Sequence, residues 1–408
     1  MRITYIHQYF STMDSAGGVR SYIFSKYLVS KGHEVTVIAS DNSLPEKYKG
    51  IKRFEVDGIK VISVKTNYTA NLNFAQRISA FIKFMILSSY LALKTSPDLV
   101  FATSTPLTVA FPGLVVKFLK RVPFVFEARD LWPDVPIELG IIKNRVLIFL
   151  LKVFEKITYH FADKIVCISE GIKEKIPAPD RKKVYVPIGC DLDLFDGVRN
   201  SRWKQDAGIT GGSLFVFTGA IGVANCPEYL MKAAKILKEK NENDISIALV
   251  GKGSAQEDVL KMKGKYHLDN VFMFDPVPKG KLPEILASAD GGLILHGLST
   301  TYRETASPNK FYDYIAAGLP IIFNFQGQLK DLILEKRAGC YVGYQSPEEL
   351  SDVLLHISQN KKEALEFGRN ARLLAERRFD LKKIVVQFED ILVECYRVGQ
   401  GRCRPFPP

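Results

Sequence analysis

The chain has 408 residues, 47% of them hydrophobic, and a mean hydropathy of +0.01. This length fits two to three domains of roughly 150 residues, and the apolar fraction excludes a mostly disordered chain or a small disulfide-bonded scaffold. Lys and Arg number 56 against 44 Asp and Glu, a net charge of +12. Such a charge favours an anionic partner, whether nucleic acid, a phosphate-bearing substrate or a membrane surface.

The six cysteines are scattered and lack metal-ligand spacing, which is typical of reduced, buried cysteines in a cytosolic protein without a metal site. The opening MRITYIHQYF does not resemble a secretory signal. The most apolar stretch, residues 78–93, is interrupted by Lys83. It predicts a buried helix, or alternatively a helix lying on a membrane, rather than a spanning segment.

Strands and helices alternate along the first half of the chain. Residues 1–10, 21–31 and 33–40 form a strand–helix–strand unit, which predicts parallel strands covered by helices. Further strands are expected at residues 61–65, 99–102, 124–126 and 164–168, and further helices at 77–94, 110–119 and 145–161.

The alternation restarts near residue 214, after a Gly- and Asp-rich segment at 189–201 that predicts a hinge. Strands are expected at 214–219, 245–250, 271–274, 292–295, 320–323 and 341–342. Helices are expected at 227–241, 258–266, 283–288, 309–317, 347–358, 361–379 and 382–397, followed by an eleven-residue loose tail. Two doubly wound halves would face a central cleft, with ligands outside the carboxyl ends of the strands.

Three glycine-containing loops each join a strand to a helix. Gly17 and Gly18 leave backbone N–H groups open at a helix N-terminus, which suits a phosphate, although an ordinary tight turn has the same pattern. Loops 217–227 and 249–256 occupy corresponding places in the second half. They contribute Gly219, Gly251 and Lys252 as candidate phosphate contacts.

The segment FEARDLWPD, residues 126–134, follows a predicted buried strand. It places Glu127, Arg129 and Asp130 in one loop together with an aromatic residue, a composition that suits sugar binding and charge stabilisation. The alternative is a salt-bridged loop around a core tryptophan.

The segment SPNK, residues 307–310, predicts a helix start with Ser307 as the N-cap and Pro308 at the first helical position. Free N–H groups beside Lys310 would form an anion site that includes Asn309. Asp313 lies on about the same helix face. An ordinary capped helix is the alternative.

Residues 141–161 predict a basic amphipathic helix with a broad apolar stripe. The stripe consists of Val146, Leu147, Phe149, Leu150, Val153, Phe154 and Ile157, and the basic residues are Lys143, Arg145, Lys152 and Lys156. Salt-sensitive attachment to an anionic membrane and a simple sheet-covering role both remain open.

In this order, the segments resemble the retaining glycosyltransferases of the GT-B fold, family-four type, and among them bacterial O-antigen and capsule enzymes such as N-acetyl-fucosamine transferases. The resemblance rests on the opening IHQYF…GGVRSYIFSKYLVSKGHEVTVIAS, EARDLWPD, VPIGCDLDLF and SPNKFYDYIAAGLPII. It implies two Rossmann-like domains, residues 1–195 and 196–381, with helix 382–397 crossing back to the first. It also implies a metal-independent reaction, with a nucleotide-sugar held mainly by the second domain and its diphosphate by Lys310, Lys252 and backbone amides.

The sequence departs from that family in two respects. Many relatives carry two Glu where this chain has Thr305 and Asp313. Relatives also often have His at Arg129, and basic residues after the glycine turn that here reads Gly219-Ala220-Ile221.

We therefore expect a cytoplasmic sugar transferase, associated peripherally with the inner face of the cytoplasmic membrane, that needs no cofactor. It would transfer an N-acetylated deoxyhexose from a UDP-sugar to a lipid-linked saccharide. The expected catalytic residues are Glu127, Arg129, Asp130 and Lys310, and the expected donor contacts are Gly17, Gly18, Gly219, Gly251, Lys252, Ser307, Asn309, Lys310 and Asp313. A UDP-sugar 2-epimerase and a catalytically silent UDP-sugar-binding scaffold are the alternatives, whereas no nucleic-acid motif is present.

Overall fold

The computed structural model describes residues 1–41, 50–66, 74–198, 201–210, 212–297 and 299–402. Contacts divide the chain into two compact units. The first contains Met1–Thr12, Gly18–Pro187 and the chain from Lys383 on, and the second contains Met13–Gly17 and Ile188–Lys382. Backbone hydrogen bonds from Cys190 N to Phe379 O (2.6 Å) and from Leu381 N to Cys190 O (3.1 Å) tie the start of the predicted hinge to the second unit. Hinge residues 199–200 lie outside the described residues.

The sheet of the first unit has the order β3-β4-β2-β1-β5-β6-β7-β8. Its strands are β1 (Arg2–Ile6), β2 (Glu34–Ser40), β3 (Ile51–Val56), β4 (Ile59–Val64), β5 (Leu99–Thr103), β6 (Phe124–Ala128), β7 (Lys164–Cys167) and β8 (Lys183–Tyr185). All neighbours pair in parallel except β3 and β4. The sequence pattern does not predict β3 and β8, since both are edge strands without the continuous apolar run of a buried parallel strand.

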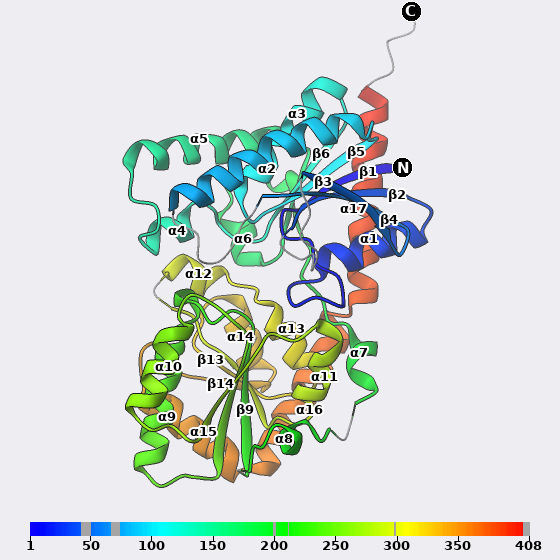
Figure 1. Cartoon of the computed structure of the whole chain (residues 1–408). Coiled ribbons are helices and arrows are strands. Elements are labelled where there is room, and N and C mark those ends of the chain that lie inside the picture. The colour runs from blue at the N-terminus through cyan, green and yellow to red at the C-terminus, as the bar shows by residue number, and fades with distance from the viewer. Residues whose placement is uncertain (42–49, 67–73, 199–200, 211, 298, 403–408) are drawn as a thin grey trace, which may run out of the picture. The chain divides into compact units, whose positions relative to one another are not determined.

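Helices cover both faces of this sheet. On one face α1 (Arg20–Ser30) and α17 (Leu381–Arg402) meet through Phe24 and Phe388, whose ring centroids are 4.6 Å apart. Figure 1 shows α2 (Phe74–Lys94), α3 (Ala110–Lys120) and α5 (Arg145–Phe161) together on the other side. The short helices are α4 (Asp134–Glu138) and α6 (Glu170–Lys175).

The predicted loose tail is wrong for residues 398–402, because α17 continues to Arg402. A Cβ atom on Gly399 would lie 2.5 Å from Cγ of Pro123, so this last part of the helix packs closely against the segment just before β6. The remaining tail, residues 403–408, lies outside the described residues.

The second sheet is entirely parallel, with the order β11-β10-β9-β12-β13-β14. Its strands are β9 (Ser213–Thr218), β10 (Ile245–Val250), β11 (Val271–Phe274), β12 (Gly291–Ile294), β13 (Ile321–Phe323) and β14 (Gly339–Tyr341). The helices of this unit are α7 (Leu192–Asp196), α8 (Trp203–Asp206), α9 (Pro227–Glu239), α10 (Gln256–Lys265), α11 (Leu282–Leu286), α12 (Thr300–Thr305), α13 (Asn309–Ala316), α14 (Gln328–Glu335), α15 (Pro347–Gln359) and α16 (Lys361–Arg378).

Both sheets confirm the predicted α/β doubly wound architecture and share one topological feature. The strand order reverses between β1 and β5 in the first sheet and between β9 and β12 in the second. Loops that leave two such neighbouring strands diverge to opposite sides, and ligands of open α/β sheets bind at this point. The loops after these four strands are therefore where a site is expected.

Candidate functional site

Lys310, the second residue of α13, is the most unusual group at the switch point of the second sheet. Its side chain is buried, and its Nζ atom has no hydrogen-bond partner among the described residues. The Nζ atom lies 3.6 Å from the centroid of the Phe217 ring on β9. Burial lowers the pKa of Lys310 from 10.5 to about 7. A buried cation without a counter-charge is costly to keep, and a bound anion would offset that cost.

The predicted glycine loops pack against each other beside Lys310. Gly219 has φ 107°, a conformation that favours glycine, and a Cβ atom placed on it would lie 3.8 Å from Cε of Lys310. A Cβ atom on Gly251 would lie 1.8 Å from the Gly219 carbonyl oxygen, and one on Gly253 would lie 2.2 Å from that of Ile221. The two loops thus require glycine for backbone contact, and the structure brings Gly219, Gly251 and Lys310 together.

Lys252, the other predicted cation, points elsewhere. Its Nζ atom lies 2.9 Å from Oδ1 of Asp275, and its side chain is 60% exposed. Pairs as exposed as this one contribute little to stability. Because Lys252 already has a carboxylate partner at the surface, an anion would have to compete with Asp275 for it.

Ser307 does not cap α13, so the predicted capping role is wrong. The N-cap is Pro308, in extended conformation, and the helix begins at Asn309, whose side chain is exposed. The Oγ atom of Ser307 lies 2.7 Å from the hydroxyl of Tyr312 instead. Pro308 has a ψ angle of 139°, outside the helical region, so the helix begins one residue later than predicted. The first turn of α13 therefore lacks a side-chain cap.

Asp313 forms an ion pair with Lys279, and both side chains are only 13% exposed. Lys279 also lies 5.9 Å from the centroid of the Phe195 ring. The sequence does not single out this lysine, because it stands in the loop between β11 and α11 without any motif around it. The Asp313 carboxylate is therefore held in place by a neighbouring cation.

Glu127 at the end of β6 is fully buried and bound on both oxygens. Arg20 on α1 lies 2.9 Å from Oε1, and the hydroxyl of Thr103 donates to Oε2 at 2.6 Å. Arg20 also donates to the carbonyl oxygens of Val186 and Pro187. This network connects α1, β5, β6 and the segment after β8, and it gives each carboxylate oxygen of Glu127 a partner within the protein.

Arg129 and Asp130 follow β6 and meet groups from the switch point of the first sheet. The Arg129 N–H donates to Oγ of Ser104 at 2.9 Å, and its guanidinium lies 3.5 Å from Nε2 of His7. The Asp130 Oδ2 atom accepts from Thr105 at 3.1 Å, whereas Oδ1 is buried without a partner in the described part of the chain. Burial raises the pKa of Asp130. The neighbouring His7 was missed in the sequence; burial and the Arg129 charge hold its pKa well below 6.5.

The Gly17–Gly18 loop precedes α1, as predicted. Gly17 has φ 143°, which again favours glycine. The N-cap of α1 is Val19, which provides no side-chain hydrogen bond to the first turn. The N-terminus of α1 therefore relies on other groups to satisfy its N–H donors.

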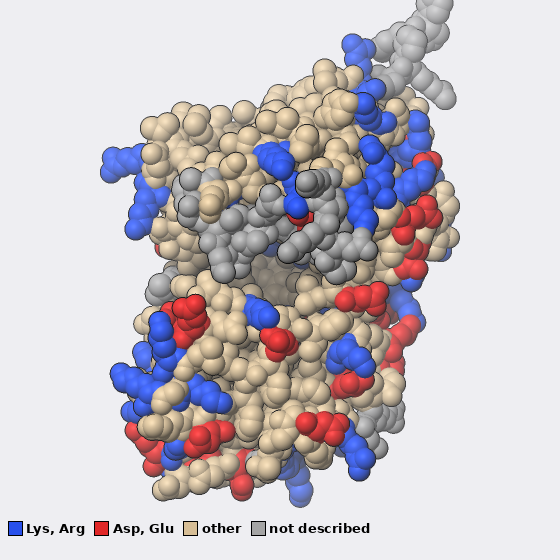
Figure 2. Space-filling model, in the orientation of Figure 1, with Lys and Arg blue, Asp and Glu red and all other residues tan. Residues whose placement is uncertain are grey.

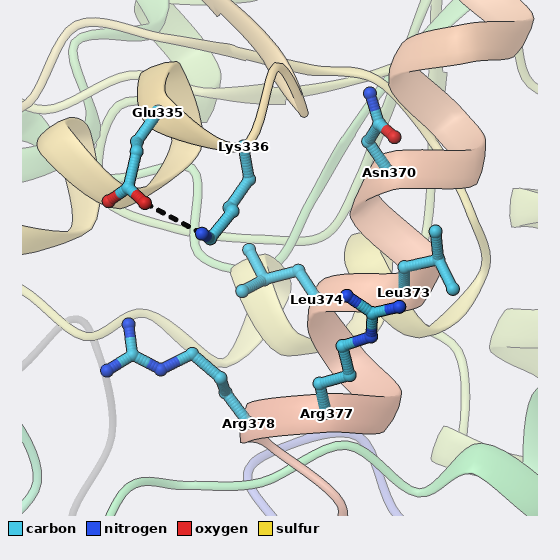
Figure 3. Close-up of a pocket in the computed structure, with 7 residues that line it drawn as sticks. All are labelled: Glu335, Lys336, Asn370, Leu373, Leu374, Arg377 and Arg378. Atoms are coloured by element: carbon cyan, nitrogen blue, oxygen red, sulfur yellow. Dashed lines mark hydrogen bonds and ion pairs between the residues drawn. The ribbon is translucent and has the colours of Figure 1, made fainter.

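A cavity of about 560 Å³ lies elsewhere in the second unit, between α14 and α16 (Figure 3). Figure 3 shows Lys336 paired with Glu335 at one side, and Arg377 and Arg378 at the other. Its other lining residues are Asn370, Leu373 and Leu374. The cavity contains none of the predicted site residues, so it does not coincide with the Lys310 site.

No group of three or more His, Cys, Asp and Glu side chains arranged to hold a metal ion occurs within the described part of the chain. Among the helices described there, none is long and apolar enough to cross a membrane.

Comparison with known proteins identifies the family. Residues 17–189 match the glycosyl transferase 4-like domain, and residues 200–374 match the glycosyl transferases group 1. An uncharacterized glycosyltransferase of Methanocaldococcus jannaschii is 22% identical over 256 residues, which cover 61% of this chain and 63% of that protein. A match to spore coat protein SA of Bacillus subtilis covers 60% of that protein. The chain thus spans about three fifths of the length of the curated relatives it matches.

Three solved structures share the fold over nearly the whole chain. Sucrose-phosphate synthase from Thermosynechococcus elongatus has a TM-score of 0.78 at 15% identity, covering 97% of this chain and 99% of that chain. HepE of Anabaena, in complex with UDP and glucose, has 0.73 at 14% identity, with 96% and 99% covered. WaaG, a glycosyltransferase involved in lipopolysaccharide biosynthesis, has 0.70 at 17% identity, with 96% and 99% covered. The chain belongs to the group 1 glycosyltransferases of the family-four type and has the GT-B fold.

Proposed function

We propose that this protein is a retaining, metal-independent glycosyltransferase that transfers a sugar from a UDP-sugar to a lipid-linked saccharide. The observation that carries the proposal is the buried Lys310, unpaired among the described residues, beside the Gly219 loop at the switch point of a Rossmann-like sheet. When a glycosidic bond to a diphosphate breaks, negative charge develops on the leaving group. A preorganised cation in a dry site stabilises that charge more than it stabilises the ground state.

A UDP donor is supported by HepE, a protein of the same fold that has been solved with UDP and glucose and also with UDP-glucose. Involvement in surface polysaccharide synthesis, of the O-antigen or capsule type, is supported by the fold shared with WaaG, a glycosyltransferase of lipopolysaccharide biosynthesis. An N-acetylated deoxyhexose as the transferred sugar is supported by the sequence resemblance to N-acetyl-fucosamine transferases.

On the acceptor side we assign the chemistry to Arg129 and Asp130. Asp130 has a buried oxygen without a partner among the described residues and a raised pKa, which favours proton exchange with an acceptor hydroxyl. Arg129 would stabilise developing negative charge, held in place by Ser104 and the neutral His7. Glu127 serves by fixing Arg20, since both of its carboxylate oxygens are already bound.

We also propose that the protein lies at the inner face of the cytoplasmic membrane through α5. The buried residues of this helix are Glu155, Thr158 and Tyr159, so its apolar stripe points outward. The exposed large apolar side chains on α5 and just before it are Ile141, Val146, Phe149, Leu150, Val153, Ile157 and Phe161. In Figure 2 the upper left of the first unit is largely tan, with Lys and Arg atoms at its left edge and another group of them near the middle. A helix with this polarity lies in a membrane interface.

The neighbouring helices extend this apolar surface. Phe118 on α3 packs edge-on against Phe161 with centroids 5.0 Å apart, and it is itself exposed. Further exposed apolar side chains on α2 and α3 are Ile82, Ile86, Tyr90, Phe111 and Leu119. Lys152, by contrast, is paired with Asp134 at 2.6 Å and Glu155 at 3.0 Å, so it is not one of the lipid contacts predicted from the sequence. Attachment therefore combines apolar insertion with charge.

The deciding experiment incubates the protein with a panel of UDP-sugars and lipid-linked saccharides and reads the products by mass. We expect that a single sugar residue is transferred from one UDP-sugar of the panel to an acceptor, without added metal. Formation of an epimer of the donor, with no acceptor product, would instead identify a 2-epimerase. Binding of UDP-sugar with neither product would indicate a silent scaffold.

A further inference from the structure

We propose that His296 and Arg303 complete the donor site around Lys310, with His296 donating one ring N–H to a phosphate oxygen and accepting from a sugar hydroxyl through its other ring nitrogen. This inference rests on the proposed function and assigns two residues that lie outside the sequence motifs of the family. With these two residues, the site would bind a diphosphate joined to a sugar rather than a simple anion.

Several buried side-chain nitrogen atoms near Lys310 lack hydrogen-bond partners among the described residues. His296 is fully buried, and neither Nδ1 nor Nε2 has a hydrogen-bond partner in the part of the chain that the structure describes. The Nε atom of Arg303 and the Nζ atom of Lys310 are likewise buried without partners there. Buried polar atoms are nearly always hydrogen-bonded in native proteins, so an unpaired group is expected to meet a ligand or ordered water.

The second observation is the position of His296. It comes directly after the Leu295 that follows β12, on the opposite side of the switch point from Gly219, which follows β9. The next residue, Gly297, approaches the β9 loop: its N–H donates to the Ala224 carbonyl oxygen at 2.8 Å. The loops after β9 and β12 are thus joined, with His296 at their junction.

The ring of His296 is held in a fixed orientation. Its centroid lies 4.5 Å from that of Tyr302 and 5.5 Å from that of Phe325. The backbone of His296 exchanges two hydrogen bonds with the side chain of Asn324, at 2.7 and 3.0 Å. Because the ring is already ordered, little conformational entropy is lost when a ligand binds.

The hydrogen-bond donors and acceptors of His296, Arg303 and Lys310 indicate which kind of ligand fits the site. Burial and the nearby charges of Lys310 and Arg303 lower the pKa of His296 to about 3, so the imidazole stays neutral, with one N–H donor and one acceptor nitrogen. Arg303 and Lys310 offer only donors. A set of three donors and one acceptor matches phosphate oxygens next to a hydroxyl, which is the junction between the diphosphate and the sugar of the donor.

Arg303 is positioned by aromatic stacking. Its Cζ atom lies 4.0 Å from the centroid of the Tyr344 ring, and one terminal nitrogen lies 3.5 Å from the Thr300 hydroxyl. Stacking leaves the in-plane Nε–H available to bind an acceptor.

The test measures UDP, pyrophosphate and uridine binding by calorimetry for wild type, His296→Phe, Arg303→Met and a control, His356→Phe. His356 is a half-exposed histidine on α15 that pairs with Glu363. We expect His296→Phe to keep the aromatic stack and the fold, to weaken UDP and pyrophosphate binding about tenfold or more, and to leave uridine binding unchanged. We expect Arg303→Met to do the same and the control variant to match wild type.

A His296→Phe variant that folds and binds both phosphates within twofold of wild type overturns the inference. If that variant does not fold, His296→Gln decides: reduced affinity supports the inference and unchanged affinity overturns it. The Lys310→Met variant distinguishes the proposed function from the inference about His296. If Lys310→Met loses UDP binding and His296→Phe keeps it, Lys310 binds the donor as proposed and His296 takes no part. If wild type binds pyrophosphate through His296 but UDP does not compete with pyrophosphate, the site binds an anion as inferred. The proposal that the donor is a UDP-sugar is then wrong.

Discussion

The ammonium of Lys310 lies 3.6 Å from the centroid of the Phe217 ring and has no hydrogen-bond partner among the residues that the structure describes. The ring face offers a cation partial compensation, worth roughly 0.5–2 kcal/mol, which is less than the cost of burying the charge. The protein therefore retains a destabilising group at the place where two glycine loops meet. Such a trade of stability for function is typical of binding and catalytic sites.

Replacing Lys310 with Met is expected to separate stability from function. The variant fills a similar volume without a charge, so its free energy of unfolding at pH 7 should rise by a few kcal/mol, from roughly 1.4 kcal/mol per unit of pKa shift. UDP binding should weaken by about 1.5–3 kcal/mol, and transfer should be lost. Denaturant unfolding and calorimetry measure the two quantities. A less stable variant with unchanged UDP affinity would contradict both expectations.

The stability difference between Lys310→Met and wild type should depend on pH. The folded-state pKa of Lys310 is about 7, below its ordinary value of 10.5. Below pH 7 the ammonium is charged in both states, and the folded state carries the full cost of burial. Between pH 7 and about 10.5 the folded state loses the proton first, so the cost falls. The melting temperatures of the two proteins should therefore converge as pH rises through this window, and a constant difference would argue against a buried charge.

Glu127 and Asp130 are expected to respond differently to loss of charge. Glu127→Gln leaves Arg20 as a buried charge without its partner, which should destabilise the first unit by about 3–5 kcal/mol. Asp130→Asn should leave stability nearly unchanged and lower kcat much more than it weakens donor binding. Thermal unfolding measures the stability of both variants, and initial rates at saturating donor measure their kcat. Normal kcat in a folded Asp130→Asn variant would remove Asp130 from catalysis.

Membrane attachment should depend more on the apolar face of α5 than on its charges. Changing Val146, Phe149 and Leu150 to Ser should reduce binding to anionic vesicles more than tenfold, because burial of each large side chain is worth roughly 1.5–3 kcal/mol. Changing Lys143, Arg145 and Lys156 to Gln should remove only the salt-sensitive part. Sedimentation with vesicles at low and high salt measures both effects.

The control for membrane attachment carries Leu260→Ser and Leu365→Ser, which replace exposed leucines in the second unit. It should bind vesicles like wild type. Equal partitioning of the α5 apolar variant and this control would make α5 an ordinary sheet-covering helix.

Much of the fold could be predicted because buried parallel strands are continuous apolar runs, as in LFVFTG before Ala220 and ISIALV before Gly251. The edge strand β3, which mixes three charged residues with three apolar ones, lacks that signal, and so does the helix end beyond Val398, which carries two glycines. Patterning along the chain does not reveal that Gly399 packs against Pro123.

The candidate site was predicted where a motif surrounds the residue and missed where partners come from distant segments. Lys310 and Gly219 stand in recognisable loops. The partners of Glu127 and Asp313 are Arg20 and Lys279, which are far away in the sequence and give no local signal. Only the structure distinguishes Asp130, a carboxylate with one oxygen unpaired among the described residues, from Glu127, which is fully bound, although the two lie three residues apart.

Counting the protons taken up on binding shows whether the Lys310 ammonium binds the donor diphosphate. UDP binding is measured by calorimetry at pH 8 in two buffers of different ionisation enthalpy, for wild type and Lys310→Met. With a free-state pKa of about 7 the lysine is mostly neutral at pH 8, and the diphosphate restores its charge. We expect uptake of nearly one proton per UDP bound by wild type and none by any residual binding to Lys310→Met. Tight UDP binding by wild type without proton uptake, or equal uptake in the variant, would contradict it.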